Sequence, residues 1–198
     1  MSRTIIRLTE SRLRGVIRNI ILETLACLGG NYAKRIRYLC HAIKEGDIVA
    51  IDEASLIMSK YVPQGSILIP IPSHNGKATY TLKLAQFIAK RTKSKVMDIL
   101  SSPSRESMYN LKMRNMDVQN VNLNFSGAVD DDGSIANRLS AVRNVILIDN
   151  VVSSGVTYEQ AQKEIKRRYG VDAWMLSLGA IQNSPFDRGQ KRVIRSIF

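Results

Sequence analysis

The sequence predicts an α/β fold in which a mainly parallel sheet is wound on both faces by helices. Short apolar runs at 66–72, 96–100 and 145–148 are typical of buried strands, and helix-periodic segments separate them. Alternating strands and helices with short connections are typical of a doubly wound parallel sheet. In such sheets ligands bind beyond the carboxyl ends of the strands, where the strand order reverses.

The start of the chain predicts helices only, so we expect an N-terminal helical extension at 1–62 and an α/β domain at 63–198. Pro63-Gln-Gly65 interrupts the helical periodicity at this boundary. Apolar residues recur at three- and four-residue steps in three segments before it: 9–28, 31–45 and 48–60. After it we expect, in order, a strand at 66–72, a helix at 78–91, a strand at 96–100, an irregular polar stretch at 101–120, a short strand at 121–125, an acidic turn at 129–134, a strand at 145–148, a helix at 158–169 and a strand at 173–178.

The net charge and the composition limit the classes of function that the chain can have. The formal net charge is +12, with Lys and Arg crowded at both termini. This pattern suits nucleic acid, although solvated basic helix faces and electrostatic steering of an anionic substrate explain it as well. No apolar run approaches the roughly 18 residues of a membrane span, and the basic N-terminus lacks a secretory pattern. Cys27 and Cys40 have no metal-ligand spacing, so we expect free thiols in the cytoplasm.

The segment 145–157 predicts an anion site. Its apolar run ends in Asp149 and Asn150, and a loop of small and hydroxylated residues leads into the helix expected from Tyr158. Backbone N–H groups, hydroxyls and the positive end of the helix dipole converge on one point in this arrangement. Asp149, just before that point, can hold a polyol or contact a magnesium ion.

A second strand-to-helix loop follows the strand expected at 66–72. Backbone donors at Asn75 and Gly76 and the charge of Lys77 suit a pyrophosphate group, and His74 is either a donor to phosphate or a surface residue. The full set of candidates in this loop is Ser73, His74, Asn75, Gly76 and Lys77.

The polar segment 105–115 has no core pattern. Long loops of this kind in compact domains are functional or disordered. Arg105, Lys112 and Arg114 are candidates to neutralise a leaving pyrophosphate, and for each of them an exposed charged loop is the alternative.

The segment 145–157 resembles the 5-phosphoribosyl-1-pyrophosphate (PRPP) signature of type I phosphoribosyltransferases: four apolar residues, two acids, two apolar residues, then Thr/Ser-Thr/Ser-Gly-x-Thr. The resemblance implies catalytic contacts from Asp149 and Asn150 to the ribose, with Mg²⁺ reached from Asp149 indirectly, through ribose or water. Asn150 departs from the pattern, because it is an amide where the signature has a second acid. The residues assigned to the 5′-phosphate are Val152, Ser153, Ser154, Gly155, Val156 and Thr157.

Over residues 38–180 the order of motifs is similar to the ComF-like branch of that family. Ile69-Pro-Ile-Pro-Ser-His74 matches its apolar-Pro-apolar-Pro-x-His loop, which implies pyrophosphate binding there. Arg105, Leu111 and Asn115 approximately match the motif of its hood, a flexible segment that closes over PRPP and excludes water. The branch's N-terminal cysteine zinc finger has no counterpart, and the basic helix expected at 9–28 stands in its place. The start, Ile5 to Ser11, weakly resembles N-terminal tags of some tailed-phage proteins.

The resemblance implies a Mg²⁺-dependent enzyme that transfers 5-phosphoribosyl from PRPP to a small acceptor, a nitrogenous base of nucleotide metabolism, and releases pyrophosphate. We expect a homodimer, with nucleic-acid contact through the basic termini left open. The alternative is a non-catalytic regulatory module on the same fold that binds PRPP, a nucleotide or nucleic acid. Asn150, the missing zinc finger and the net charge favour that alternative.

Overall fold

The main sheet is parallel throughout. The computed structural model describes residues 34–107, 110–111, 114, 116, 121–152, 155–180 and 194–196. Five strands pair side by side, in the order β2 (Lys95–Val96), β1 (Ile67–Pro70), β5 (Val145–Val152), β6 (Trp174–Ala180) and β7 (Ile194–Ser196).

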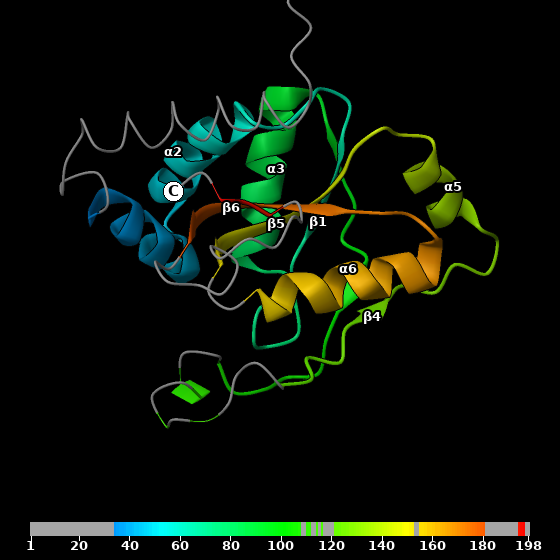
Figure 1. Cartoon of the computed structure of the whole chain (residues 1–198). Helices are drawn as coiled ribbons and strands as arrows, with labels where there is room; N and C mark the ends of the chain where they lie inside the picture. Colours follow the sequence, from blue (N-terminus) through cyan, green and yellow to red (C-terminus); the bar gives the residue numbers. More distant parts are fainter. Residues whose placement is uncertain are drawn as a thin grey trace, which may run out of the picture.

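Helices cover both faces of this sheet, which confirms the predicted doubly wound α/β class. Figure 1 shows α2 (Ile48–Ser59) and α3 (Tyr80–Thr92) on one side of the strands and α6 (Val156–Tyr169) on the other. The side chains of β5 alternate between the two layers: Ile146 and Ile148 join the core under α2 and α3, whereas Val145 and Leu147 join the core under α6. Burial on both faces is why this strand is an unbroken apolar run.

The described part of the N-terminal extension, residues 34–62, shares its core with the sheet. Ile43 in the helix at 34–45 and Ile51 in α2 are fully buried in the cluster that also contains Leu68 of β1. Asp47 separates these two helices and caps α2, because its carboxylate accepts the N–H groups of Val49 and Ala50. The helix expected at 9–28 lies outside the described residues. Among the helices that are described, none has the length and apolarity to cross a bilayer.

The strand order reverses between β1 and β5. From β1 the chain passes through α3 to β2 on one side, and it later returns to β5 on the other side of β1. Pro70 is the register partner of Ile148, so both strands end at the same edge of the sheet. The two loops that the sequence marks as anion sites follow these two strand ends.

Two expected strands are wrong. The run at 96–100 divides between β2 and β3 (Leu100–Ser101), and β3 pairs antiparallel with β4 (Ser126–Gly127) in a separate small sheet. The stretch 121–125 is not a strand, although Leu123 and Phe125 are buried as its alternation suggests. Hydrophobic alternation reports burial and does not report which backbone the strand pairs with.

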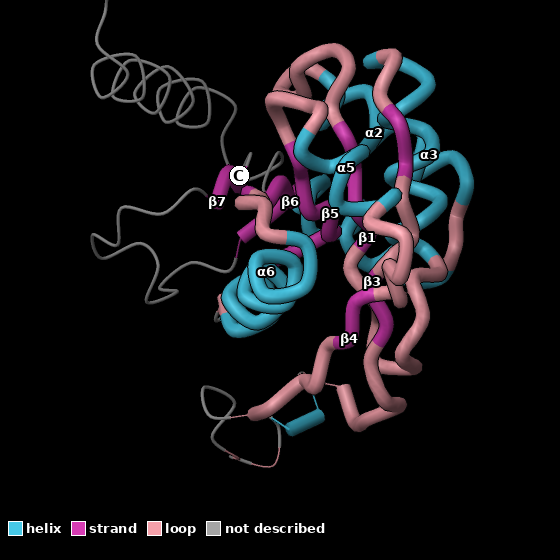
Figure 2. Tube along the Cα trace, turned by 90° about the vertical axis from the view of Figure 1, so that its right-hand side faces the viewer, coloured by secondary structure: helices cyan, strands magenta, loops and turns pink. Residues whose placement is uncertain are grey.

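Other boundaries also differ from expectation. β5 continues through Asp149 and Asn150 to Val152, and α6 begins at Val156, so the loop between them is shorter than predicted. The acidic turn at 129–134 leads into an unpredicted helix, α5 (Ser134–Ser140), whose first N–H groups are capped by Asp130. Between β3 and β4, the described residues 102–107 and 121–125 lie outside the main sheet (Figure 2) and form the outgoing and return legs of the hood.

Replacing Ile51 by Ala tests whether α2 and the sheet unfold as one unit. Trp174 of β6 is the single Trp of the chain and packs against the same cluster as Ile51. We expect one urea transition in Trp fluorescence, with the free energy of unfolding reduced by about 2–5 kcal/mol. A Trp transition that does not move with Ile51→Ala would show that residues 34–62 fold separately.

Candidate anion site at the switch point

Asp149 lies in the carboxyl half of β5, one residue beyond the last pair with β1, and is 9% exposed. Burial raises the pKa of its carboxyl group to about 6, because the ionised form loses hydration. The N–H of Asn150, which donates to Asp149 Oδ1 at 2.7 Å, and the charges of Lys44 and Arg105 act in the opposite direction on that pKa. The sheet edge therefore holds a buried carboxylate with cations on two sides.

Asn150 has a different role from the one expected. Its side chain is 1% exposed, and its amide Nδ2 donates to the carbonyl oxygen of Cys40 at 2.7 Å. Cys40 Sγ in turn donates to the carbonyl oxygen of Asn150 at 3.4 Å. The amide fastens β5 to the helix at 34–45, so it does not face the site as the predicted ribose contact requires.

The loop before α6 is the first candidate anion-binding corner. Gly155 has a left-handed backbone (φ 79°) and lies directly before the first turn of α6, and the N-terminus of a helix favours an anion. Ser153 and Ser154 lie outside the described residues, and Val156 is buried. A small cavity of about 20 Å³, enough for one water molecule, opens at this corner. Its lining is Asp149, Val151, Val152, Gly155, Thr157, Tyr158 and Met175.

The loop at 73–77 forms the second corner and is held rigid by its own hydrogen bonds. The N–H of Gly76 donates to the carbonyl of Ser73 at 3.0 Å, so it is not free for pyrophosphate as predicted. Asn75 Oδ1 accepts from the hydroxyl of Ser73 and from the N–H of Lys77. Ser73 is buried, whereas His74, Asn75 and Lys77 are exposed and carry the polar groups that this corner can offer a ligand.

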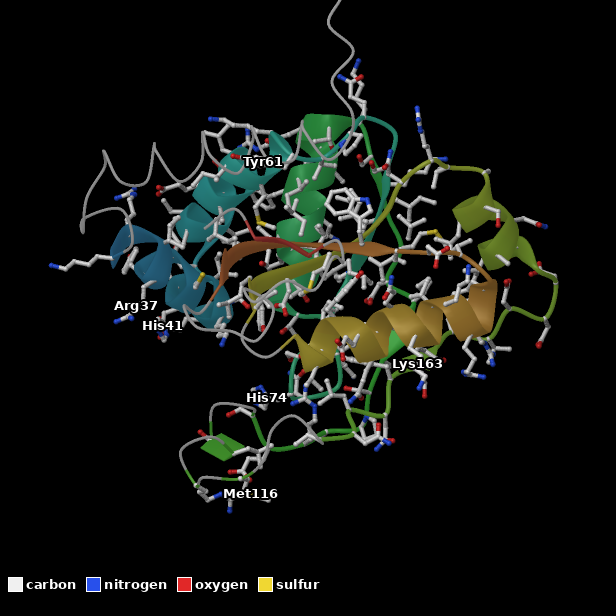
Figure 3. The ribbon with its side chains drawn as sticks, viewed as in Figure 1. Arg37, His41, Tyr61, His74, Met116 and Lys163 are labelled. Carbon is white, nitrogen blue, oxygen red and sulfur yellow. The ribbon has the colours of Figure 1, made fainter. Side chains whose placement is uncertain are left out.

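The outgoing leg of the hood is fastened to the second corner. The N–H of Ser102 donates to the carbonyl of Gly76 at 3.2 Å, and the N–H of Arg105 donates to the carbonyl of His74 at 2.8 Å. The approach is so close that a Cβ on Gly76 would lie 2.1 Å from the carbonyl oxygen of Ser102. Figure 3 shows His74 where the hood begins and Met116 at its far end.

The side chain of Arg105 lies near enough to Asp149 for their charges to interact, and its Nη1 donates to the carbonyl of Glu106 at 3.3 Å. Its guanidinium is half-buried, and burial lowers its pKa while the charge of Asp149 acts against that shift. Arg105 Nε is buried without a hydrogen-bond partner among the described residues. A buried guanidinium N–H without an acceptor is costly, and an anionic ligand between the two corners would satisfy it. Of the other two hood cations, Arg114 is exposed and paired with Glu106, and Lys112 lies outside the described residues.

The return leg of the hood is fastened to α6. Gln160 accepts the N–H of Leu123 through Oε1 and donates to the carbonyl of Val121 through Nε2, each at 2.7 Å. Glu164 accepts the N–H of Gly127 at 2.8 Å. Both legs of the hood are thus braced on elements that also shape the anion corners.

Sequence reasoning missed three residues around Asp149 and the hood. Lys44 and Tyr80 lie near enough to Asp149 to interact with its charge, and burial followed by that charge raises the pKa of the Tyr80 hydroxyl. Lys44 lies in Ile43-Lys-Glu-Gly-Asp47 at the end of the helix at 34–45, and this helix end is a local signal that could have marked it. Gln160 carries no local signal, because its partners are far away in the sequence.

A metal ion at this site has to draw most of its ligands from a substrate. Within the described part of the chain no group of three or more His, Cys, Asp or Glu side chains is placed to hold one. Mg²⁺ is commonly bound by one or two carboxylates together with substrate phosphates and water. Asp149 fits that pattern as a single carboxylate between two anion corners.

Comparisons with known proteins find similarity only in structure. No protein-family model matches the chain, and no curated protein matches it. An adenine phosphoribosyltransferase is similar with a TM-score of 0.44 and 9% identity, over 78% of this chain and 81% of that one. A hypoxanthine phosphoribosyltransferase from Staphylococcus aureus is similar with a TM-score of 0.40 and 15% identity, over 81% of this chain and 71% of that one. Since both TM-scores are below 0.5, a functional assignment has to rest on the geometry of this chain.

Gly76→Ala tests the contact between the second corner and the hood. Gly76 has φ +84° and meets the Ser102 carbonyl, whereas Gly65 has φ +73° and open space around the same position. We expect Gly65→Ala to lose about 1 kcal/mol of stability from backbone strain. Gly76→Ala should lose more than this and should raise hydrogen exchange at Ser102 and Arg105. Equal losses in the two variants would show that the contact is dispensable.

Asp149→Asn tests the cost of burying the carboxylate. The folded-state pKa of about 6 lies above the ordinary 3.8, so the penalty is absent below pH 3.8, grows as the pH rises to 6, and is complete above it. At pH 7.5 we expect the variant to be more stable than the wild type by up to roughly 3 kcal/mol in urea unfolding. The gain should shrink as the pH falls towards 4. Asp131→Asn, on the exposed acidic turn, is the control, and a gain independent of pH would rule out this explanation.

Proposed function

We propose that this protein is a PRPP-dependent phosphoribosyltransferase. The observation that carries the proposal is the position of Asp149, a buried carboxylate between two anion-binding corners at the switch point of a parallel sheet. PRPP has a matching layout, with a ribose flanked by a 5′-phosphate and a pyrophosphate. Two phosphate groups joined by a polyol suit two anion corners joined by a carboxylate.

In this proposal the corner before α6 binds the 5′-phosphate. Gly155 and Thr157 at the first turn of α6 supply backbone N–H groups and a hydroxyl, and Ser153 and Ser154 complete the loop in the sequence. Asp149 accepts hydrogen bonds from the ribose hydroxyls. Ionised acceptors form strong hydrogen bonds of this kind, which suits the role once Asp149 has lost its proton.

The corner at 73–77 and Arg105 bind the pyrophosphate. Lys77 supplies charge, and the unpartnered Nε of Arg105 supplies a buried donor. During transfer the bond from the anomeric carbon to the pyrophosphate oxygen breaks, and the pyrophosphate leaves with the electron pair. A bond from an acceptor nitrogen to the same carbon forms, and the acceptor loses its proton. Positioning and charge stabilisation provide the catalysis.

Mg²⁺, bound through the substrate phosphates and indirectly to Asp149, would neutralise the charge that develops on the pyrophosphate. We further propose a place in the ComF-like branch, without its zinc finger, and a homodimeric cytoplasmic enzyme of nucleotide metabolism. The motif order over residues 38–180 supports the branch. The basic N-terminal segment leaves nucleic acid as a second partner.

One observation favours a second candidate, a non-catalytic binding module on the same fold. Asn150 is committed to the carbonyl of Cys40, so a single acidic group, Asp149, is left to face a ribose. A regulator that binds PRPP or a nucleotide without turnover needs no more than this.

Calorimetric titration of the protein with PRPP and Mg²⁺, followed by a pyrophosphate-release assay over a panel of bases, tests the proposal. We expect saturable binding that Asp149→Ala weakens at least tenfold, because the ribose loses its acceptor. The matched control is Asp172→Ala. Asp172 is an exposed carboxylate that precedes β6, at the amino ends of the parallel strands. Binding without pyrophosphate release over the whole panel would favour the regulatory module. Absence of both heat and thermal shift in the wild type, with steeply salt-dependent binding of an oligonucleotide, would overturn PRPP as the ligand.

A further inference from the structure

The helix at 34–45 presents a row of basic side chains that the proposed PRPP site does not use. Its buried side is Ile36, Leu39, Cys40 and Ile43. Arg37, His41 and Lys44 follow at positions i, i+4 and i+7, so they share a neighbouring face over about 10 Å of helix. All three are exposed, and Figure 3 shows Arg37 and His41 next to each other on the outside of the molecule.

The helix that carries this row is attached to β5 next to Asp149. The hydrogen bonds between Asn150 and Cys40 fasten the middle of the helix to β5, one residue after Asp149. Gly179 of β6 allows the same close approach, because a Cβ there would lie 3.2 Å from Ile36. At the end of the row, the charge of Lys44 lowers the pKa of Asp149, as the charge of Arg105 does from the hood.

The charge of the row is not neutralised within the described residues. Arg35, on another face of the helix, is held by both carboxylate oxygens of Glu53, at 2.7 and 2.6 Å. No such ion pair joins a described carboxylate to Arg37, His41 or Lys44. The helix carries four Lys or Arg side chains against one carboxylate, Glu45.

We infer that the acceptor of the proposed transfer is anionic: a small nitrogenous compound with a carboxylate or phosphate group that binds to Arg37, His41 and Lys44. The inference rests on the proposed function, in which the two corners and Arg105 account for both phosphate groups of PRPP. The row is a third basic surface near Asp149, in addition to the two corners. Arg offers a planar fork to a carboxylate or phosphate and Lys a point charge, so the row selects charge at the far end of the acceptor.

Pairs of probes that differ by one carboxylate test the inference. Orotate is compared with uracil, and nicotinate with nicotinamide, in titrations of the PRPP- and Mg²⁺-loaded protein and of the free protein. Binding is followed by NMR, from the shifts of the side-chain signals of Arg37, His41 and Lys44. We expect saturable shifts with the carboxylated member of at least one pair, and affinity for the uncharged member at least tenfold lower. The double substitution Arg37→Gln with Lys44→Gln should remove that preference. The control Lys60→Gln with Lys90→Gln removes the same charge at the far ends of α2 and α3 and should keep it.

Each outcome separates this inference from the proposed function. A wild type that binds no PRPP overturns the proposed function, whatever the probes do. A wild type that binds PRPP but does not distinguish the members of either pair overturns the anionic acceptor alone. Fluorescence anisotropy with a single-stranded oligonucleotide covers the competing explanation. If Arg37→Gln with Lys44→Gln abolishes salt-dependent oligonucleotide binding and the carboxylated probes give no shifts, the row is a nucleic-acid surface and the inference is wrong.

Discussion

The parallel pairing of β1 with β5 is the constraint on which the rest of the structure depends. The register from Ile67 opposite Val145 to Pro70 opposite Ile148 places the end of β1 beside Ile148, the residue before Asp149. The loop at 73–77 and the loop before α6 are far apart in the sequence, and this pairing alone brings them together. The same pairing also sets the distance that the hood spans, because one of its legs is hydrogen-bonded to the loop at 73–77 and the other to α6.

The site keeps polar groups in unfavourable states inside an otherwise well-satisfied core. Asp149 is buried with a raised pKa, and Arg105 has a buried donor without an acceptor, although the two charges attract each other. Perturbed ionisable groups of this kind cluster at functional sites, where stability is given up for ligand binding. A bound anion would supply the missing acceptor and a set of hydroxyls would supply donors to the carboxylate.

Asn150 shows how one substitution in a motif can follow from packing. Its amide donates to the carbonyl of Cys40 in a place that excludes water. An aspartate there would put a carboxylate oxygen against a carbonyl oxygen, at a large cost in a buried position. The amide therefore belongs to the attachment of the helix at 34–45, and that attachment carries Lys44 to the edge of the site.

Much of the fold was determined by the sequence alone, because burial leaves a local pattern. The apolar runs in β1 and β5 and the periodicity of α2, α3 and α6 predicted the doubly wound sheet, and the two loops that the sequence marks as candidate anion sites lie at the same edge of it. The tertiary structure decided the remainder. It divided 96–100 between two sheets, replaced a strand at 121–125 by bonds to the side chain of Gln160, and turned Asn150 into the core. In each case the deciding partner is a hydrogen-bonding group far away along the chain, and hydrophobic periodicity carries no information about such partners.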